Sequence, residues 1–164
     1  MSISTPFRPL TSRDEPLLRD MLYYAVFVPP GRDPWPRDVI DRPEVSLYVR
    51  EWGRAGDAGL AAVDQVTNQD VGATWIRLFT AAAPGYGYVA DDIPELSIAL
   101  APGHRGQGLG AALLESLFTL AAPQYSALSL SVSPQNAALR LYERLGFRQV
   151  ADHGLAITML KPLR

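Results

Sequence analysis

The segment from residue 95 to residue 122 constrains the fold of this chain more than any other. A strand-like apolar run at 95–101 leads into a glycine-rich turn, Pro102-Gly103-His104-Arg105-Gly106-Gln107-Gly108-Leu109-Gly110, and an amphipathic helical pattern follows at 109–122. Glycines allow a tight turn and let backbone N–H groups approach a ligand without a Cβ between them. A helix N-terminus adds unpaired donors and a partial positive charge. The segment therefore predicts a binding site for a phosphate or pyrophosphate group.

A second motif lies downstream, on a predicted strand and the helix that follows it. It runs Ser133-Pro134-Gln135-Asn136-Ala137-Ala138-Leu139-Arg140-Leu141-Tyr142-Glu143-Arg144-Leu145-Gly146-Phe147. We predict that Ser133 caps the helix, with Pro134 at the favoured first helical position and Gly146 at its end. Asn136 would then lie in the first turn, and Tyr142 about 9 Å farther along the helix axis.

Together the two motifs resemble the GNAT superfamily of acetyl-CoA-dependent N-acetyltransferases. Arg105, Gly108 and Gly110 match the family's phosphate-binding pattern, Arg/Gln-x-x-Gly-x-Gly/Ala. The family's second pattern, Asn-x-x-Ala-x-x-Leu-Tyr-x-x-x-Gly-Phe, is matched by Asn136, Leu141-Tyr142 and Gly146-Phe147, with a leucine at position 139 in place of the alanine. The specific part of the resemblance covers about residues 95 to 150.

The resemblance implies an α/β fold, with a mixed, mostly antiparallel twisted sheet flanked by helices. The central parallel strands, 95–101 and 126–133, would splay apart and hold the acyl-coenzyme arm. The remaining patterns agree with this order of elements. They predict a strand at 3–10, a helix that starts at a Ser12–Glu15 capping box, a short helix at 45–52, strands at 60–65 and 71–80, a loop at 82–94, and a hairpin of 147–151 with 155–160. We expect residues 1–164 to form a single acetyltransferase domain.

The resemblance also implies which residues bind acetyl-CoA. They are Leu100, Arg105, Gly106, Gln107, Gly108, Leu109, Gly110, Asn136 and Tyr142. Arg105 either neutralises a phosphate or stays a solvated loop cation. Tyr142 is either the leaving-group residue or a core aromatic. Because a thiol with a pKa near 8.5 is more acidic than a phenol near 10, full proton transfer from Tyr142 to the departing thiolate is uphill by about 2 kcal/mol. We therefore expect Tyr142 to stabilise the thiolate by a hydrogen bond.

The acceptor amine needs a base. At pH 7 a lysine-like amine is neutral in only about one molecule in 2,500, whereas an α-amine near pKa 7.8 is deprotonated far more easily. Glu95 is the predicted base, since it opens the strand before the glycine turn, where family members often place an acid; the alternative is a surface charge at the strand edge. Asp91 and Asp92 are alternative bases, or attract a cationic acceptor. The acceptor pocket is predicted between the loops at 27–38 and 82–94. Trp35, Tyr86 and Tyr88 pack either against an apolar or aromatic group of the acceptor or against each other.

Composition excludes several other classes of site. The chain has no cysteine, which excludes disulfides, thiol catalysis and thiolate metal sites, and its two histidines are too few for a typical zinc site. The net charge of −2 and the lack of a signal pattern lead us to expect a cytoplasmic protein without nucleic-acid or membrane partners. The expected partner is a small-molecule or peptide amine. A monomer and a homodimer are both compatible with the sequence.

Two other functions are compatible with parts of the sequence. Gly106, Gly108 and Ala111 also match the Gly-x-Gly-x-x-Ala fingerprint of dinucleotide-binding enzymes. That site needs an acidic residue at the end of the next strand, and residues 131–134 contain none. The second alternative is a noncatalytic acyl-CoA sensor on the same fold. The motifs contain no covalent nucleophile, which favours direct attack of the amine on acetyl-CoA in a ternary complex.

Overall fold

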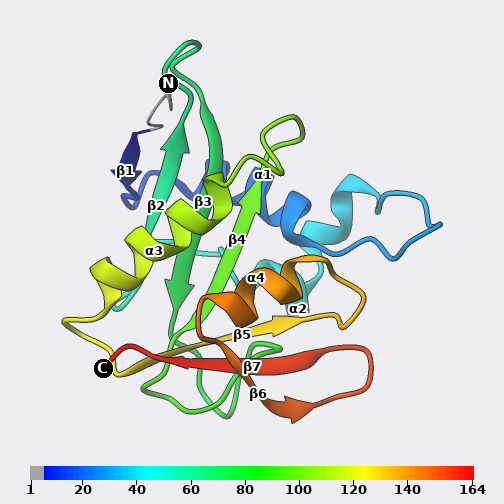
Figure 1. Cartoon of the computed structure of the whole chain (residues 1–164), viewed down its shortest axis with the longest axis vertical. Helices are drawn as coiled ribbons and strands as arrows, with labels where there is room; N and C mark the ends of the chain where they lie inside the picture. The colour runs from blue at the N-terminus through cyan, green and yellow to red at the C-terminus, as the bar shows by residue number, and fades with distance from the viewer. Residues whose placement is uncertain (1–5) are drawn as a thin grey trace.

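The computed structural model describes residues 6–164 and contains one seven-stranded sheet with helices on both of its faces (Figure 1). In chain order its elements are β1 (Phe7–Pro9), α1 (Glu15–Ala25), the 3-10 helix η1 (Arg37–Asp41), α2 (Pro43–Ser46), β2 (Ala58–Val63), β3 (Asp70–Arg77), β4 (Glu95–Leu100), α3 (Leu109–Ala121), β5 (Ala127–Val132), α4 (Ala138–Arg144), β6 (Arg148–Asp152) and β7 (Ile157–Pro162). The predicted α/β fold is confirmed. Of the strand predicted at 3–10, residues 3–5 lie outside the described residues.

The sheet divides at the junction of β4 and β5. The strand order is β1-β2-β3-β4-β5-β7-β6, and every neighbouring pair is antiparallel except β4 with β5. These two strands are parallel and share a single register pair, Glu95 with Ser129. From there they run apart, as Figure 1 shows. The predicted splay of the central strands is therefore present, and Glu95 lies at the point where it closes.

The two faces of the sheet carry separate cores, and β4 contributes to both. Side chains alternate along a strand, so Leu96 lies on one face and Glu95 on the other. Leu96 belongs to a core made with α3, β5 and α4, which includes Leu128, Leu130 and Tyr142. The opposite face is covered by α1, η1 and the segment after α2. The splay between β4 and β5 thus connects the α4 side of the sheet with the α1 side.

The start of α1 differs from the prediction. The helix begins at Glu15 with Asp14 as its N-cap residue, and no side chain makes a capping hydrogen bond there. The Asp14 carboxylate instead accepts hydrogen bonds from the Arg8 guanidinium and from the Thr11 N–H. Glu15 Oε1 accepts the Trp52 N–H at 3.1 Å. The predicted Ser12–Glu15 capping box does not form, because the Glu15 carboxylate binds the distant Trp52 N–H instead.

The helix predicted at 45–52 is also shorter than expected. Only Pro43–Ser46 forms α2, and turns continue to residue 51. The guanidinium of Arg77, buried on β3, donates to the carbonyls of Leu47 at 2.9 Å and Arg50 at 2.7 Å. Because these carbonyls bond to Arg77, they do not continue the helix. Arg77 is neutralised by Asp57, also buried, at 2.8 Å.

The helix that carries the second motif begins later than predicted. Residues 133–137 form turns, and α4 starts at Ala138. Ser133 Oγ accepts the N–H of Gln135 at 3.2 Å, and Asn136 Oδ1 accepts the N–H of Ala138 at 2.9 Å. The prediction that Ser133 caps the helix is wrong, because its hydroxyl closes a local turn. Asn136 precedes the helix and does not lie in its first turn.

Candidate active site

A groove of about 1560 Å³ passes through the splay and reaches both faces of the sheet. Its walls come from β4, β5, the glycine turn, the start of α4, the end of α1 and the loop that follows α1. Six of the predicted site residues line it: Glu95, Leu100, Arg105, Gly110, Asn136 and Tyr142. Four others lie on the glycine turn outside this lining: Gly106, Gln107, Gly108 and Leu109. The fold therefore brings residues of both motifs to one groove.

The glycine turn has a backbone that requires glycine. Gly103, Gly106 and Gly108 have φ values of +90°, +75° and +80°, which L side chains rarely adopt. A Cβ at any of the three would have no atom within 4 Å, so the turn presents open backbone. Gly108 is the N-cap residue of α3, and no side chain caps the helix. The first N–H groups of α3 lack intrahelical partners, which suits an anionic group such as a pyrophosphate.

Two side chains of the turn bond back to its own backbone. Arg105 Nε donates to the Leu100 carbonyl at 3.2 Å, and Gln107 Nε2 donates to the Gly103 carbonyl at 3.4 Å. Arg105 is exposed, and its terminal nitrogens make no hydrogen bond within residues 6–164. The side chain of Leu109 packs against a small core around Leu113. Leu109 can therefore offer a ligand only its backbone.

Tyr142 is 8% exposed and lies in the core on the α4 side. Its ring packs edge-on against Phe147, with centroids 5.9 Å apart. No hydrogen bond within residues 6–164 contributes to its pKa, and the residue lines the groove. Burial raises the pKa of Tyr142 to about 12. Full proton transfer to a thiolate of pKa 8.5 would therefore be uphill by about 5 kcal/mol, whereas hydrogen-bond donation has no such cost.

Glu95 is 3% exposed, so it is not a surface charge at the strand edge. Its Oε2 accepts the Tyr48 hydroxyl at 2.5 Å, and its Oε1 accepts the Gly87 N–H at 2.9 Å. Burial raises the pKa of Glu95 to about 7, and the two donors oppose this shift. A buried carboxylate that titrates near neutrality, in a groove, has the properties of a general base.

The loop at 85–87 lies directly against Glu95. A Cβ on Gly85 would overlap Glu95 Oε1 and would lie 2.9 Å from the Tyr48 hydroxyl. A Cβ on Gly87 would lie 2.6 Å from the carbonyl carbon of Leu130 on β5. The two glycines thus allow the loop to approach both central strands. Sequence reasoning did not assign Tyr48 to the site, because its helical spacing with neighbouring apolar residues indicated only a core position.

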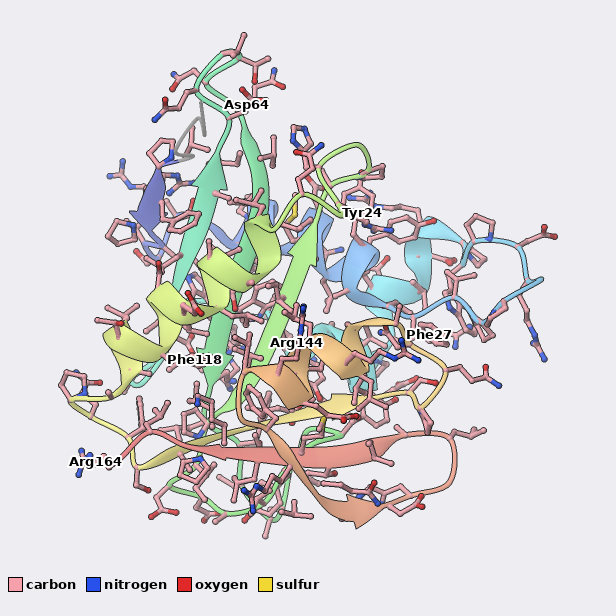
Figure 2. All side chains as sticks on the ribbon, viewed as in Figure 1. Tyr24, Phe27, Asp64, Phe118, Arg144 and Arg164 are labelled. Carbon is pink, nitrogen blue, oxygen red and sulfur yellow. The ribbon has the colours of Figure 1, made fainter. Side chains whose placement is uncertain are left out.

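The wall on the α1 side is apolar and aromatic. Trp35 is fixed in it by an Nε1 hydrogen bond to the Phe27 carbonyl at 2.9 Å, and the Arg42 guanidinium lies over its ring at 5.5 Å. Tyr24 and Phe27 belong to the same wall (Figure 2). Of the loop predicted at 82–94, only Tyr86 lines the groove.

Tyr88, Asp91 and Asp92 are not in this lining. The Tyr88 hydroxyl donates to Asp91, and both aspartates are exposed. The groove lining therefore gives no support to Tyr88 as an acceptor contact or to Asp91 and Asp92 as bases, and those roles stay predictions. The loop that carries them folds so that its glycines, not its acidic residues, face Glu95.

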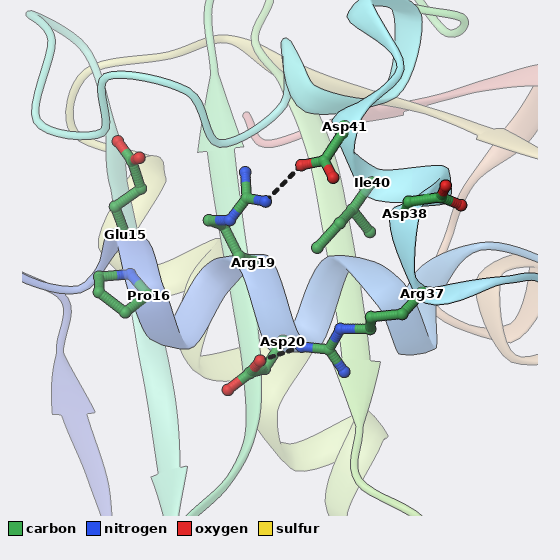
Figure 3. A pocket seen from close by; sticks show the side chains of 8 residues that line it. All are labelled: Glu15, Pro16, Arg19, Asp20, Arg37, Asp38, Ile40 and Asp41. Atoms are coloured by element: carbon green, nitrogen blue, oxygen red, sulfur yellow. Dashed lines mark hydrogen bonds and ion pairs between the residues drawn. The ribbon is translucent and has the colours of Figure 1, made fainter.

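A smaller cavity of about 520 Å³ lies between α1 and η1, away from both motifs (Figure 3). Its charged side chains pair with each other, Arg19 with Asp41 at 2.5 Å and Arg37 with Asp20. Both ion pairs join a residue of α1 to a residue of η1. None of the predicted site residues lines this cavity.

Residues 6–164 contain neither a metal-binding cluster nor a membrane-spanning helix. No group of three or more histidine, aspartate or glutamate side chains is placed to hold a metal ion. In the same part of the chain, no helix has both the length and the apolarity needed to cross a membrane.

Comparison with known proteins agrees with the geometry. Residues 56–149, more than half of the chain, match a family model described as an acetyltransferase (GNAT) domain. No curated protein matches the sequence.

Similar solved structures share the fold at low sequence identity. An acetyltransferase, YncA from Salmonella typhimurium, solved with its cofactor acetyl-CoA, has a TM-score of 0.68 and 19% identity over 99% of this chain and 95% of that one. The ribosomal-protein-S18-alanine N-acetyltransferase from Escherichia coli has a TM-score of 0.64 and 21% identity over 98% and 94%. A phosphinothricin acetyltransferase from Sinorhizobium meliloti, in complex with acetyl-CoA, has a TM-score of 0.66 and 19% identity over 98% and 89%.

Proposed function

The chain belongs to the GNAT family of acetyltransferases, whose acyl donor is acetyl-CoA, and from this premise we propose that it acetylates a primary amine of a small molecule or peptide. The observation that carries the proposal is the buried carboxylate of Glu95, in the same groove as the residues assigned to the coenzyme. A donor site without a base would suit a sensor. A base that titrates near pH 7 suits an enzyme that must deprotonate an amine.

The coenzyme would be held on the α4 side of the groove. The open backbone of the glycine turn and the uncapped start of α3 would bind its pyrophosphate, with the Arg105 guanidinium beside them. Leu100, Asn136 and Tyr142 would border its pantetheine arm. The Asn136 oxygen already bonds to Ala138, so only its amide NH₂ would face a ligand.

The acceptor amine would lose its proton to Glu95, directly or through water. When bound, acetyl-CoA supplies an acetyl thioester, which the neutral amine attacks directly in a ternary complex. Proton transfer to a carboxylate of pKa about 7 is uphill by about 5 kcal/mol from a lysine-like ammonium and by only about 1 kcal/mol from an α-amine. Glu95 therefore favours acceptors of low basicity, or amines whose pKa falls on desolvation in the groove.

Tyr142 would act on the other product of the transfer. No hydrogen bond within the described residues contributes to the pKa of its hydroxyl, and the raised pKa keeps it protonated. A hydrogen bond from this hydroxyl would stabilise the developing thiolate without full proton transfer. Glu95 and Tyr142 come from opposite faces of the sheet, so the amine and the thiolate would be served from opposite sides of the splay.

The acceptor side of the groove favours an amine with an apolar or aromatic body. Its wall includes Phe27, Trp35 and Tyr86, and three charged side chains besides Glu95 line the whole groove: Arg42, Glu44 and Arg105. Arg42 and Glu44 have opposite charges and are exposed. The lining thus lacks the cluster of carboxylates that a polyamine or an aminoglycoside would require.

A panel of amines with acetyl-CoA tests the proposal. Thiol release and the mass of the product would be measured for arylalkylamines, peptides with an apolar N-terminal residue, free amino acids, polyamines and aminoglycosides. We expect the highest kcat/KM for the first two classes. Saturable binding of acetyl-CoA without transfer to any amine would indicate a sensor and contradict the proposal, and binding of NAD in its place would indicate a dinucleotide enzyme.

A further inference from the structure

Tyr48 belongs to neither of the two motifs, yet it makes the shortest hydrogen bond to Glu95. It lies on the turns after α2, 47 residues before Glu95 in the chain. We infer that Tyr48 is a positioning residue, whose hydroxyl fixes Oε2 of Glu95 and keeps the carboxylate ionised and oriented for the acceptor. This inference rests on the proposed function for the role of Glu95, but the coupling between the two side chains can be measured without any acceptor.

The direction of the hydrogen bond follows from the groups involved. The Tyr48 hydroxyl is 2.7 Å from the backbone nitrogen of Tyr86, and an amide N–H can only donate. The hydroxyl oxygen therefore accepts from Tyr86, and its single proton is left for Oε2 of Glu95. Oε1 is held in turn by the Gly87 N–H. Because both donors act on the carboxylate, they favour its charged form over the protonated form.

The position of Tyr48 is itself fixed by the surrounding core. The residue is 6% exposed, and its ring packs edge-on against Phe79 with centroids 5.2 Å apart. Its carbonyl accepts the indole N–H of Trp75 at 3.1 Å. Burial and the nearby Glu95 charge raise the pKa of Tyr48 above its ordinary value, so its hydroxyl stays protonated. The donor to Glu95 is thus held in place by β3 and by the segment that directly follows it.

Few groups face the Glu95 carboxylate, so the contribution of one hydrogen-bond donor to the pKa of Glu95 can be measured. They are the Tyr48 hydroxyl from the turn after α2 and the Gly87 N–H from the loop before β4. Of the described residues, only these two, together with burial, determine the pKa of Glu95, and no charged side chain contributes. Loss of the hydroxyl should therefore change the titration of Glu95 directly.

Tyr48→Phe tests the inference, because it keeps the ring and removes only the hydroxyl. A hydrogen bond to a charged group is worth about 1.5–3 kcal/mol, which corresponds to a rise of about one to two pH units in the pKa of Glu95. We expect kcat/KM to fall by about tenfold at pH 7 and to recover most of the parent value at pH 9. Tyr125→Phe is the matched control, since it removes a hydroxyl that donates to the Gly56 carbonyl and should leave the profile unchanged.

The titration of Glu95 would also be followed by carboxyl ¹³C NMR in the free protein, which needs no turnover. A Glu95 pKa in Tyr48→Phe within about 0.3 units of the parent value would overturn the inference, even if activity is lost. A shifted pKa in a protein that acetylates no amine would overturn the proposed function and leave the coupling standing.

If Tyr48→Phe does not fold, 3-fluorotyrosine in place of Tyr48 provides a stronger donor. It should move the pKa of Glu95 in the opposite direction, and no change would again overturn the inference.

Discussion

The two halves of the candidate site are built in different ways. The coenzyme half is built mainly on a continuous segment, in which β4, the glycine turn and α3 follow one another along the chain, and the second motif adds Asn136 and Tyr142. It offers a ligand mostly backbone, and its glycines have open space where side chains would be. The base half is assembled from Tyr48, the loop at 85–87 and Glu95, which meet only in the folded chain.

This difference determines how each half tolerates change. In the coenzyme half, the requirement is a backbone conformation, so a substitution acts through φ angles and open volume. In the base half, the requirement is a network of three hydrogen bonds around one buried carboxylate, so a substitution acts through proton affinity. We therefore expect variants of the glycine turn to change coenzyme binding, and variants of the base half to change the pH dependence of turnover.

Glu95→Gln should have the largest effect. The variant keeps the shape of the side chain but removes the base, and a positioned base contributes about 10²- to 10⁴-fold to rate. In the parent, kcat/KM should rise with pH through about 7, because Glu95 must be ionised to accept a proton. The variant should lose this rise, while its affinity for acetyl-CoA, measured by calorimetry, stays unchanged. A parent-like pH profile would show that solvent deprotonates the amine.

Tyr142→Phe should have the next largest effect, with turnover reduced about one hundredfold. No hydrogen bond within the described residues contributes to the pKa of the hydroxyl, so its loss should cost little stability. Single-turnover acetyl transfer would be measured together with the thermal midpoint of unfolding. Equal single-turnover rates in variant and parent would make Tyr142 a packing residue of the α4 core. This variant also tests the difference between the two halves of the site, because Tyr142 would be a side-chain hydroxyl that acts in a half that otherwise offers mostly backbone.

Gly108→Val should weaken acetyl-CoA binding by at least about tenfold, or about 1.4 kcal/mol. The φ of +80° at this position disfavours any L side chain, and a branched one would cover the start of α3. Gly31→Val is the control for backbone strain, because Gly31 has a φ of +79°, no atom within 4 Å of a Cβ, and no place in the groove lining.

Gly110→Ala is the control for volume. A Cβ on Gly110 would lie 3.8 Å from Leu100 and 3.9 Å from Leu141, which is ordinary contact. The family pattern also permits alanine there, so we expect near-parent affinity. Equal losses in Gly108→Val and Gly31→Val would contradict the assignment of the pyrophosphate to this turn.

The sequence was sufficient to predict the sheet and its splay, because two short motifs carry the family resemblance that implies them. The glycine turn between an apolar strand and a helix is readable in a few residues, and β4 and α3 follow as predicted. Glu95 could be selected by its position on the strand. The burial of Glu95 and its hydrogen bond to Tyr48 could not be predicted. They depend on a segment 47 residues away, whose apolar pattern indicates only a core position.

Two of the local errors have one physical cause, which is competition from partners outside the helix itself, whereas Ser133 fails as a cap because its hydroxyl closes a local turn. The start of α1 was misassigned because Arg8, Thr11 and Trp52 occupy the carboxylates of Asp14 and Glu15. The helix after residue 46 is lost because a buried arginine binds its carbonyls. Capping and helical spacing describe what a segment prefers alone, and buried charges from other elements override that preference.

Asp91→Asn with Asp92→Asn should have the smallest effect, with kcat/KM changed by less than about twofold. Both carboxylates are exposed and outside the groove lining, and Asp91 already accepts the Tyr88 hydroxyl. Exposed charges are screened at a Debye length of about 8 Å in physiological salt, so they should add little to acceptor binding there. Kinetics of the double variant would be measured at low and physiological ionic strength. A tenfold rise in KM that disappears in high salt would mean that the loop steers a cationic acceptor. Acidic residues outside the groove would then belong to the base half of the site, which the structure limits to Glu95 and its two donors.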